Sequence, residues 1–97
     1  MYVAVIYSKG PNWREEGPKG EHISPHIAHQ HRLFDEDILL MGGPFTDGGG
    51  GGLAILDVES LDEAQGIVGN DPAVKAGFYE VVFHPWRISL NALNREE

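Results

Sequence analysis

Apolar residues gather in four short runs along the chain, and two segments with helical start signals lie between these runs. Residues 2–8 are rich in β-branched and aromatic side chains, as strands typically are. Glycine, proline or aspartate stands at one or both ends of each of the other three runs. The pattern therefore predicts four strands, at residues 2–8, 38–41, 53–58 and 78–84.

The first helix signal follows a long segment rich in glycine and proline, "KGPNWREEGPKGE". Ser24 is expected to be the N-cap and Pro25 the first helical residue, because both residue types favour these positions. The helix is predicted to run to about Glu36. Ile27 and Phe34 lie seven residues apart, so we expect them on its inward face.

The second helix signal is the capping box Ser60-Leu61-Asp62-Glu63. In such a box the side chains of the first and last residues, Ser60 and Glu63, each accept a hydrogen bond from a free backbone N–H group. Gly69 and Asn70 are expected to end this helix, and Asp71-Pro72 to start a short turn through Gly77. The predicted order is βαββαβ. This order is typical of the ferredoxin-like fold, which belongs to the α+β class. In this fold two helices lie on one face of an antiparallel sheet.

The predicted strands are apolar on both faces, as residues 2–7, 38–41 and 53–56 show. A sheet with one face in water should alternate apolar and polar residues. Two helices cover only one face, so we expect the other face to be covered by the sheet of a second copy. The sequence therefore predicts a homodimer, with a higher oligomer left open.

Composition narrows the function classes. The 97 residues form a single domain, residues 1–97, with 15 acidic against 7 basic residues and no cysteine. The few basic residues are scattered, so neither nucleic acid nor a membrane surface is expected as a partner. No signal peptide and no apolar stretch of membrane-spanning length is evident, which gives a cytoplasmic expectation.

Strand directions bring four irregular segments to one end of the sheet, where small-molecule sites tend to form. His26 lies there in the first helical turn, where the helix dipole favours a neutral imidazole that can accept a proton. Asp71 lies at the same end and can hold the imidazole in one tautomer. The alternative interpretation is that Asp71 only caps the turn before Pro72 and His26 is a partly buried polar residue.

Two other features of the sequence resemble ligand-binding motifs, but neither matches one. His22, His26 and His29 have spacings that would suit a metal, but His22 precedes the helix and no Cys or HExxH pattern accompanies them, so we expect neither metal nor cofactor. The glycine tract at residues 48–52 leads into a strand rather than a helix, unlike a phosphate-binding loop. It is predicted to be a hairpin tip at the rim of the same site.

The motifs "PH", "LLMGGPF", "ESLDEA", "DPAVKAG" and "HPW" occur in an order that resembles the YCII-related (YciI-like) family. The resemblance covers about residues 2–86 and implies the dimeric α+β barrel fold, with muconolactone isomerase-like relatives. It also implies a catalytic His–Asp dyad, which falls on His26 and Asp71. Asp35 and Asp37 lie near family-type positions as well, but they are a full helix length from His26.

The resemblance implies lyase-, isomerase- or dehydrochlorinase-like chemistry on a small cyclic or aromatic compound, by general acid–base catalysis without a cofactor. Gly43, Pro44 and Phe45 are expected to shape the substrate pocket. The long loop before the first helix is expected to form a lid that carries Trp13. A non-catalytic module of the same dimeric fold, which binds a small ligand or serves in assembly, remains the alternative.

Overall fold

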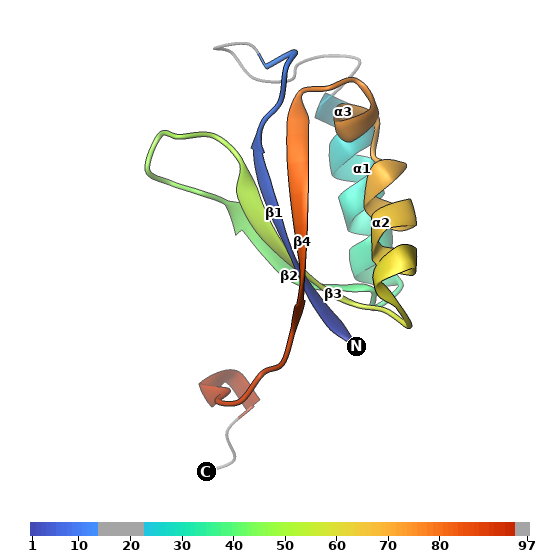
Figure 1. Cartoon of the computed structure of the whole chain (residues 1–97), viewed down its shortest axis with the longest axis vertical. Helices are drawn as coiled ribbons and strands as arrows, with labels where there is room; N and C mark the ends of the chain where they lie inside the picture. Colours follow the sequence, from blue (N-terminus) through green and yellow to red (C-terminus); the bar gives the residue numbers. More distant parts are fainter. Residues whose placement is uncertain (14–22, 95–97) are drawn as a thin grey trace.

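The computed structural model describes residues 1–13 and 23–94 of the chain. The elements confirm the βαββαβ order, with one short helix added (Figure 1). None of the helices in these described ranges is long and apolar enough to cross a membrane. In chain order the elements are β1 (Tyr2–Lys9), α1 (Ile23–Asp35), β2 (Leu39–Pro44), β3 (Gly52–Asp57), α2 (Leu61–Gly69), α3 (Pro72–Lys75), β4 (Tyr79–Trp86) and a 3-10 turn (Ala92–Asn94).

The four strands form one antiparallel sheet in the order β2-β3-β1-β4. β1 and β3 lie in the centre, and β2 and β4 form the edges. The helices lie on one face of the sheet, and the hairpin between β2 and β3 projects on the opposite side (Figure 1). The predicted fold class, α+β with a ferredoxin-like sheet, is confirmed.

Side chains of β1 alternate between the two faces of the sheet. Val3, Val5 and Tyr7 face the helices and are buried, whereas Ile6 on the other face is 37% exposed. Leu56 of β3 lies opposite Val3 and completes the centre of the core. The rest of the buried cluster comes from β3, the segment after it and α2, namely Ala54, Val58, Ala64 and Val68.

Several element boundaries differ from the prediction, and β2, for example, ends at Pro44 rather than at Met41. α1 begins at Ile23, so Ser24 and Pro25 lie within its first turn rather than at the N-cap and the first helical position. Proline is tolerated there because the first N–H groups of a helix have no intrahelical partner. β4 continues beyond His84 and through Pro85. Because β4 is an edge strand, a proline without an N–H group does not interrupt the interior of the sheet.

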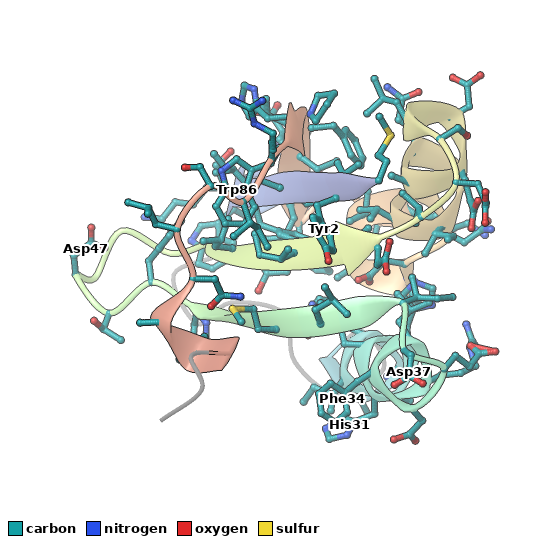
Figure 2. The ribbon with its side chains drawn as sticks, turned by 90° about the horizontal axis from the view of Figure 1, so that it is seen from below. Tyr2, His31, Phe34, Asp37, Asp47 and Trp86 are labelled. Carbon is teal, nitrogen blue, oxygen red and sulfur yellow. The ribbon has the colours of Figure 1, made fainter. Side chains whose placement is uncertain are left out.

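The inward face of α1 also differs from the prediction. His26, His29 and Leu33 are buried, whereas Ile27 is 46% exposed and Phe34 is 56% exposed. Figure 2 shows Phe34 on the side of α1 that is turned away from the sheet. Spacings of three and four residues place the two histidines and Leu33 on one stripe. The imidazoles can be buried because both have hydrogen-bond partners.

The predicted capping box of α2 is confirmed. Ser60 Oγ accepts a hydrogen bond from the Glu63 N–H group at 3.1 Å. The Glu63 side chain in turn accepts from the backbone N–H group of Glu59 at 3.1 Å, one residue before the ideal position. Asp71 caps the following one-turn helix α3 by accepting from the Ala73 N–H group at 2.9 Å. These two caps fix the path of the chain from β3 to β4.

The face of the sheet opposite the helices carries exposed apolar side chains. Met41, Leu53, Val82 and Trp86 are between 40% and 50% exposed. Ile6 and Val82 are cross-strand partners on β1 and β4, so the patch is continuous across the sheet. The helices α1, α2 and α3 lie on the other face, and the segment with the 3-10 turn borders only the part of this face near Tyr2, Met41 and Trp86.

Candidate active site

A cleft of about 420 Å³ opens at the end of the sheet where β1 and β2 finish and α1 begins. Strand directions predicted that irregular segments would meet at this end. The cleft is within the usual size range of small-molecule sites, near its lower limit. Five elements contribute to it, β1, α1, β2, β3 and β4, together with the residue that precedes β3. Its lining includes Tyr7, His26, Gln30, Gly43, Pro44, Gly51, Gly52 and Tyr79.

His26 and Asp71 are hydrogen-bonded at this cleft. His26 Nδ1 lies 2.7 Å from Asp71 Oδ2, and the two residues are 8% and 0% exposed. The other carboxylate oxygen, Oδ1, accepts from the Ala73 N–H group. Asp35 and Asp37 are exposed at the other end of α1. Of the three aspartates considered from the sequence, Asp71 is therefore the one paired with His26.

The geometry of Asp71 unites the two interpretations that the sequence left open. Asp71 caps the turn before Pro72 with one oxygen and holds His26 with the other. Because an ionised carboxylate only accepts hydrogen bonds, we assign the proton of the neutral imidazole to Nδ1. The lone pair is then on Nε2, on the opposite side of the ring.

Two aromatic rings lie beside His26, and a third packs on one of them. The Tyr79 ring lies 5.4 Å from the His26 ring, centroid to centroid, with the planes tilted by 41°. The Tyr7 ring meets Tyr79 edge to face at 5.8 Å and lies 6.5 Å from His26. Trp13 packs on Tyr79 at 5.7 Å. Such separations are typical of favourable aromatic pairs.

The electrostatics of the site oppose the ionisation of both tyrosine hydroxyls. Burial, and secondarily the nearby Asp71 carboxylate, raises the pKa of Tyr7 to about 12, while interaction with the Gln30 side chain acts in the opposite direction. Burial and then Asp71 also raise the pKa of Tyr79 above its ordinary value. A neutral phenol can donate a hydrogen bond. The cleft therefore combines one imidazole as a base candidate with two hydroxyl donors.

The structure distinguishes the predicted pocket residues from one another. Gly43 and Pro44 line the cleft. Phe45 follows the end of β2, does not belong to the lining of the cleft and is 43% exposed. Trp13 does not line it directly, and its ring contacts Tyr79 and lies 5.6 Å from the Lys9 ammonium. The predicted lid lies largely outside the described residues.

Tyr7, Gln30 and Tyr79 line the cleft but were not among the predicted site residues. One signal was available for Tyr7. It falls on the same strand face as Val3 and Val5 and at the end of β1 that leads into the site. Tyr79 can be placed at the site only when the pairing of β4 with β1 is known, because its cross-strand partner is Lys9.

The glycine tract serves two purposes. Gly48 has open space around its Cα atom and forms part of the hairpin turn, with Asp47 at the tip far from the helices (Figure 2). Gly51 has a φ of +80°, and a Cβ atom there would lie 2.1 Å from the Tyr7 carbonyl oxygen. A Cβ atom on Gly52 would lie 2.6 Å from the Gly43 carbonyl oxygen. The later glycines therefore allow backbones to approach closely and form one wall of the cleft.

The possible metal site can be tested only in part. His29 Nε2 donates to the Ile67 carbonyl at 3.1 Å, and its Nδ1 accepts from Arg32 at 2.9 Å. Both ring nitrogens are thus engaged, Nε2 in a bond that joins α1 to α2 and Nδ1 in a bond within α1. His22 lies outside the described residues. Within the described ranges, no group of three or more potential ligands is close enough to hold a metal ion.

The protein is of the α+β class, with an antiparallel sheet, helices on one face of it, and a buried His–Asp pair at a small cleft. A family model, the YCII-related domain, matches residues 1–85. The chain therefore belongs to the YCII-related family, as its motifs predicted. It is 36% identical over 75 residues to a Bacillus subtilis (strain 168) relative described as uncharacterized protein YjpA, covering 77% of this chain and 87% of that protein.

A solved structure gives a comparison with described chemistry. It is 5-chloro-2-hydroxyhydroquinone dehydrochlorinase (TftG) from Burkholderia phenoliruptrix AC1100, in complex with 2,5-dihydroxybenzoquinone. The two chains are 26% identical and superpose with a TM-score of 0.65, over 90% of this chain and 94% of TftG. The likeness supports the fold assigned above and shows that this fold can carry an enzyme.

Proposed function

We propose that this protein is a cofactor-independent enzyme that acts on a small cyclic or aromatic compound by general acid–base catalysis. His26 is the base and Asp71 orients it. The observation that carries the proposal is the 2.7 Å hydrogen bond between His26 and the fully buried Asp71 at the wall of a cleft. A base oriented by a second side chain is the usual arrangement of an activated acid–base group.

The chemistry follows from the tautomer. Nε2 takes a proton from an sp³ ring carbon, which a hydroxylated aromatic ring provides in its keto tautomer, and the imidazolium that forms is stabilised by Asp71, which already accepts the Nδ1 proton. In a lyase reaction the electron pair of the broken C–H bond forms a C=C bond. A leaving group departs from the adjacent carbon with its bonding electrons, so that HX is lost overall. In an isomerase reaction the same imidazolium returns the proton to a different carbon.

The solved neighbour supports a lyase-like reaction of this kind. TftG is a dehydrochlorinase of a hydroxylated six-membered ring, and it has the same fold at 26% identity. A cleft of about 420 Å³ accommodates one ring of that size. We therefore favour a dehydrochlorinase-like elimination over other acid–base reactions.

The test is a turnover assay on a panel of substituted monocyclic phenols, quinones and lactones, with product analysis. His26→Ala should lose turnover by about 10²-fold or more, within the range for removal of a general base. His29→Gln is the matched control, because His29 is a buried histidine on the same helix stripe but bonds to Ile67. It should lower thermal stability and leave turnover intact. Unchanged turnover in His26→Ala would reject the proposal.

The non-catalytic module is the other outcome of the same experiment. If wild-type protein binds ring compounds, as measured by thermal shift, but converts none of them, the cleft is a binding site only. We also propose a homodimer, because the sheet face opposite the helices exposes Ile6, Met41, Leu53 and Val82. A second copy that packs its own sheet on this patch would remove it from water.

A further inference from the structure

Tyr79 occupies a central place among the rings at the cleft. Its ring contacts His26 on one side and Trp13 on another, and Tyr7 meets it edge to face. Three ring contacts limit the orientations that the Tyr79 side chain can adopt. The position of its hydroxyl group relative to the His26 ring is thereby restricted.

Tyr79 and Tyr7 differ in access to a ligand. Tyr7 is 7% exposed, and its side chain interacts with Gln30, so its hydroxyl group already has a protein neighbour. Tyr79 is only half-buried and lines the open cleft. Both phenols are protonated at neutral pH, and burial and Asp71 raise the pKa of each so that it remains a donor to higher pH. Tyr79 is therefore the more accessible of the two donors.

A base that removes a proton from a ring leaves negative charge behind in the ring. If the ring carries an oxygen conjugated with the carbon that loses the proton, the charge moves onto that oxygen as the C–H bond breaks. A fixed hydroxyl donor close to the base lowers the energy of that state, as an oxyanion hole does. Asp71 cannot serve here because both of its oxygens are occupied and it carries the wrong charge.

We propose that Tyr79 is a catalytic residue whose hydroxyl group donates a hydrogen bond to an oxygen on the substrate ring while His26 Nε2 removes the proton. The inference rests on the proposed function and deepens it, because it names the substrate class. The substrate is a monocyclic ring with a hydroxyl or carbonyl group conjugated to the reacting carbon. Tyr7 acts through Tyr79 as a positioning residue, since its ring meets the Tyr79 ring at 87°.

The test compares Tyr79→Phe with His26→Ala and with Tyr2→Phe. Tyr79→Phe removes one oxygen and keeps the ring contacts with His26, Tyr7 and Trp13. Tyr2→Phe is the matched control, because Tyr2 lies on the same sheet but on the face away from the helices. Turnover is measured with 5-chloro-2-hydroxyhydroquinone, and binding with 2,5-dihydroxybenzoquinone, across a range of pH.

Tyr79→Phe should lower kcat by about 10- to 100-fold, with a smaller change in KM, because the donor acts mainly on the charge that develops in the transition state. The wild-type rate should fall at high pH as the Tyr79 phenol ionises, and this alkaline limb should be absent from Tyr79→Phe. Tyr2→Phe should match the wild type in both respects. A purely structural role for Tyr79 would not remove the alkaline limb.

The possible failures can be distinguished. If His26→Ala loses turnover while Tyr79→Phe stays within twofold of wild type, the role of Tyr79 is overturned and the proposed function stands. If His26→Ala keeps turnover, both are overturned. If the wild type binds but does not convert the probes, a roughly tenfold weaker binding by Tyr79→Phe supports the donor, and equal binding refutes it. No binding at millimolar concentration overturns the substrate class.

Discussion

The proton of the neutral His26 imidazole should reside on Nδ1, and this can be measured without a substrate. Nδ1 lies 2.7 Å from Asp71 Oδ2, an atom that only accepts. Two-bond ¹H–¹⁵N correlation spectra distinguish a protonated ring nitrogen from one with a lone pair. In the wild type we expect an Nδ1–H tautomer for His26. His29, which donates from Nε2 to Ile67, should show the opposite tautomer in the same spectrum.

Asp71→Asn should reverse the His26 tautomer with little loss of stability. Asparagine caps a helix about as well as aspartate, so its side-chain oxygen can continue to accept from the Ala73 N–H group. The remaining NH₂ group cannot accept, so His26 must move its proton to Nε2 and accept at Nδ1. Exchanging a charge-assisted hydrogen bond for a neutral one costs about 1 kcal/mol in the free energy of unfolding. The base is then lost although the fold remains.

Asp71→Ala should be more destabilising. Loss of the α3 cap costs about 1 kcal/mol. A buried His26 N–H group without a partner costs about 1–3 kcal/mol more. The expected loss is therefore about 2–4 kcal/mol in urea unfolding at neutral pH. Ser60→Ala is the matched control, since it removes the α2 cap far from the cleft and should cost about 1 kcal/mol without changing the His26 tautomer.

Two results would refute this reasoning. An Nε2–H tautomer of His26 in the wild type would show that Asp71 does not hold the ring through Nδ1. An Asp71→Asn protein that keeps the Nδ1–H tautomer would show that some group other than the carboxylate sets the proton position. The first result would remove the physical basis for His26 as the base, and the second would remove the role of Asp71 in setting its tautomer.

Three further predictions concern the wall of the cleft, the buried tyrosine and the open face. Gly51→Ala should cost about 1–3 kcal/mol more than Gly48→Ala in urea unfolding, because both glycines have positive φ but only a Cβ atom at Gly51 would meet a carbonyl, at 2.1 Å. Equal losses would contradict the close approach. The pKa of Tyr7 is about 12 in the fold against 10.0 in the unfolded chain, so its contribution of about 2–3 kcal/mol is complete below pH 10 and declines as the pH rises toward 12. Tyr7→Phe should show a correspondingly smaller alkaline loss of stability, and an unchanged loss would argue against the raised pKa. Sedimentation velocity at micromolar concentration should give a dimer for the wild type and for Gln65→Glu on α2, and a monomer for Val82→Glu on the open face; a monomeric wild type would reject the dimer.

Much of the fold could be predicted because its signals are local. The capping box at Ser60 places the start of α2 to the residue, and glycine or proline marks most strand ends. Once the order βαββαβ is known, strand direction alone brings the start of α1 and the turn at Asp71 to one end. The structure brings His26 and Asp71 within hydrogen-bond distance there. Chain direction and residue type were sufficient to suggest this pair.

What could not be predicted depends on contacts between distant parts of the chain. The hydrophobic pattern placed Ile27 and Phe34 inside, because a histidine is costly to bury unless partners exist. Those partners are Asp71 and the Ile67 carbonyl, more than 35 residues away along the chain. The role of Tyr79 likewise depends on the register between β4 and β1. A pattern within one segment carries no information about such partners.

The loop after β1 and the turn that carries Asp71 are joined by direct hydrogen bonds. Asn12 donates from its backbone to the Gly77 carbonyl at 2.8 Å and from its side chain to the Ala76 carbonyl at 2.8 Å. The next residue is Trp13, which packs on Tyr79, and Asp71 caps the helix that leads into this turn. The loop therefore contacts both the turn that follows the Asp71 cap and the ring beside His26. Because one set of backbone contacts positions both the base and the proposed hydroxyl donor, their relative geometry is fixed by the fold before a ligand binds, which is the condition for electrostatic stabilisation of a transition state.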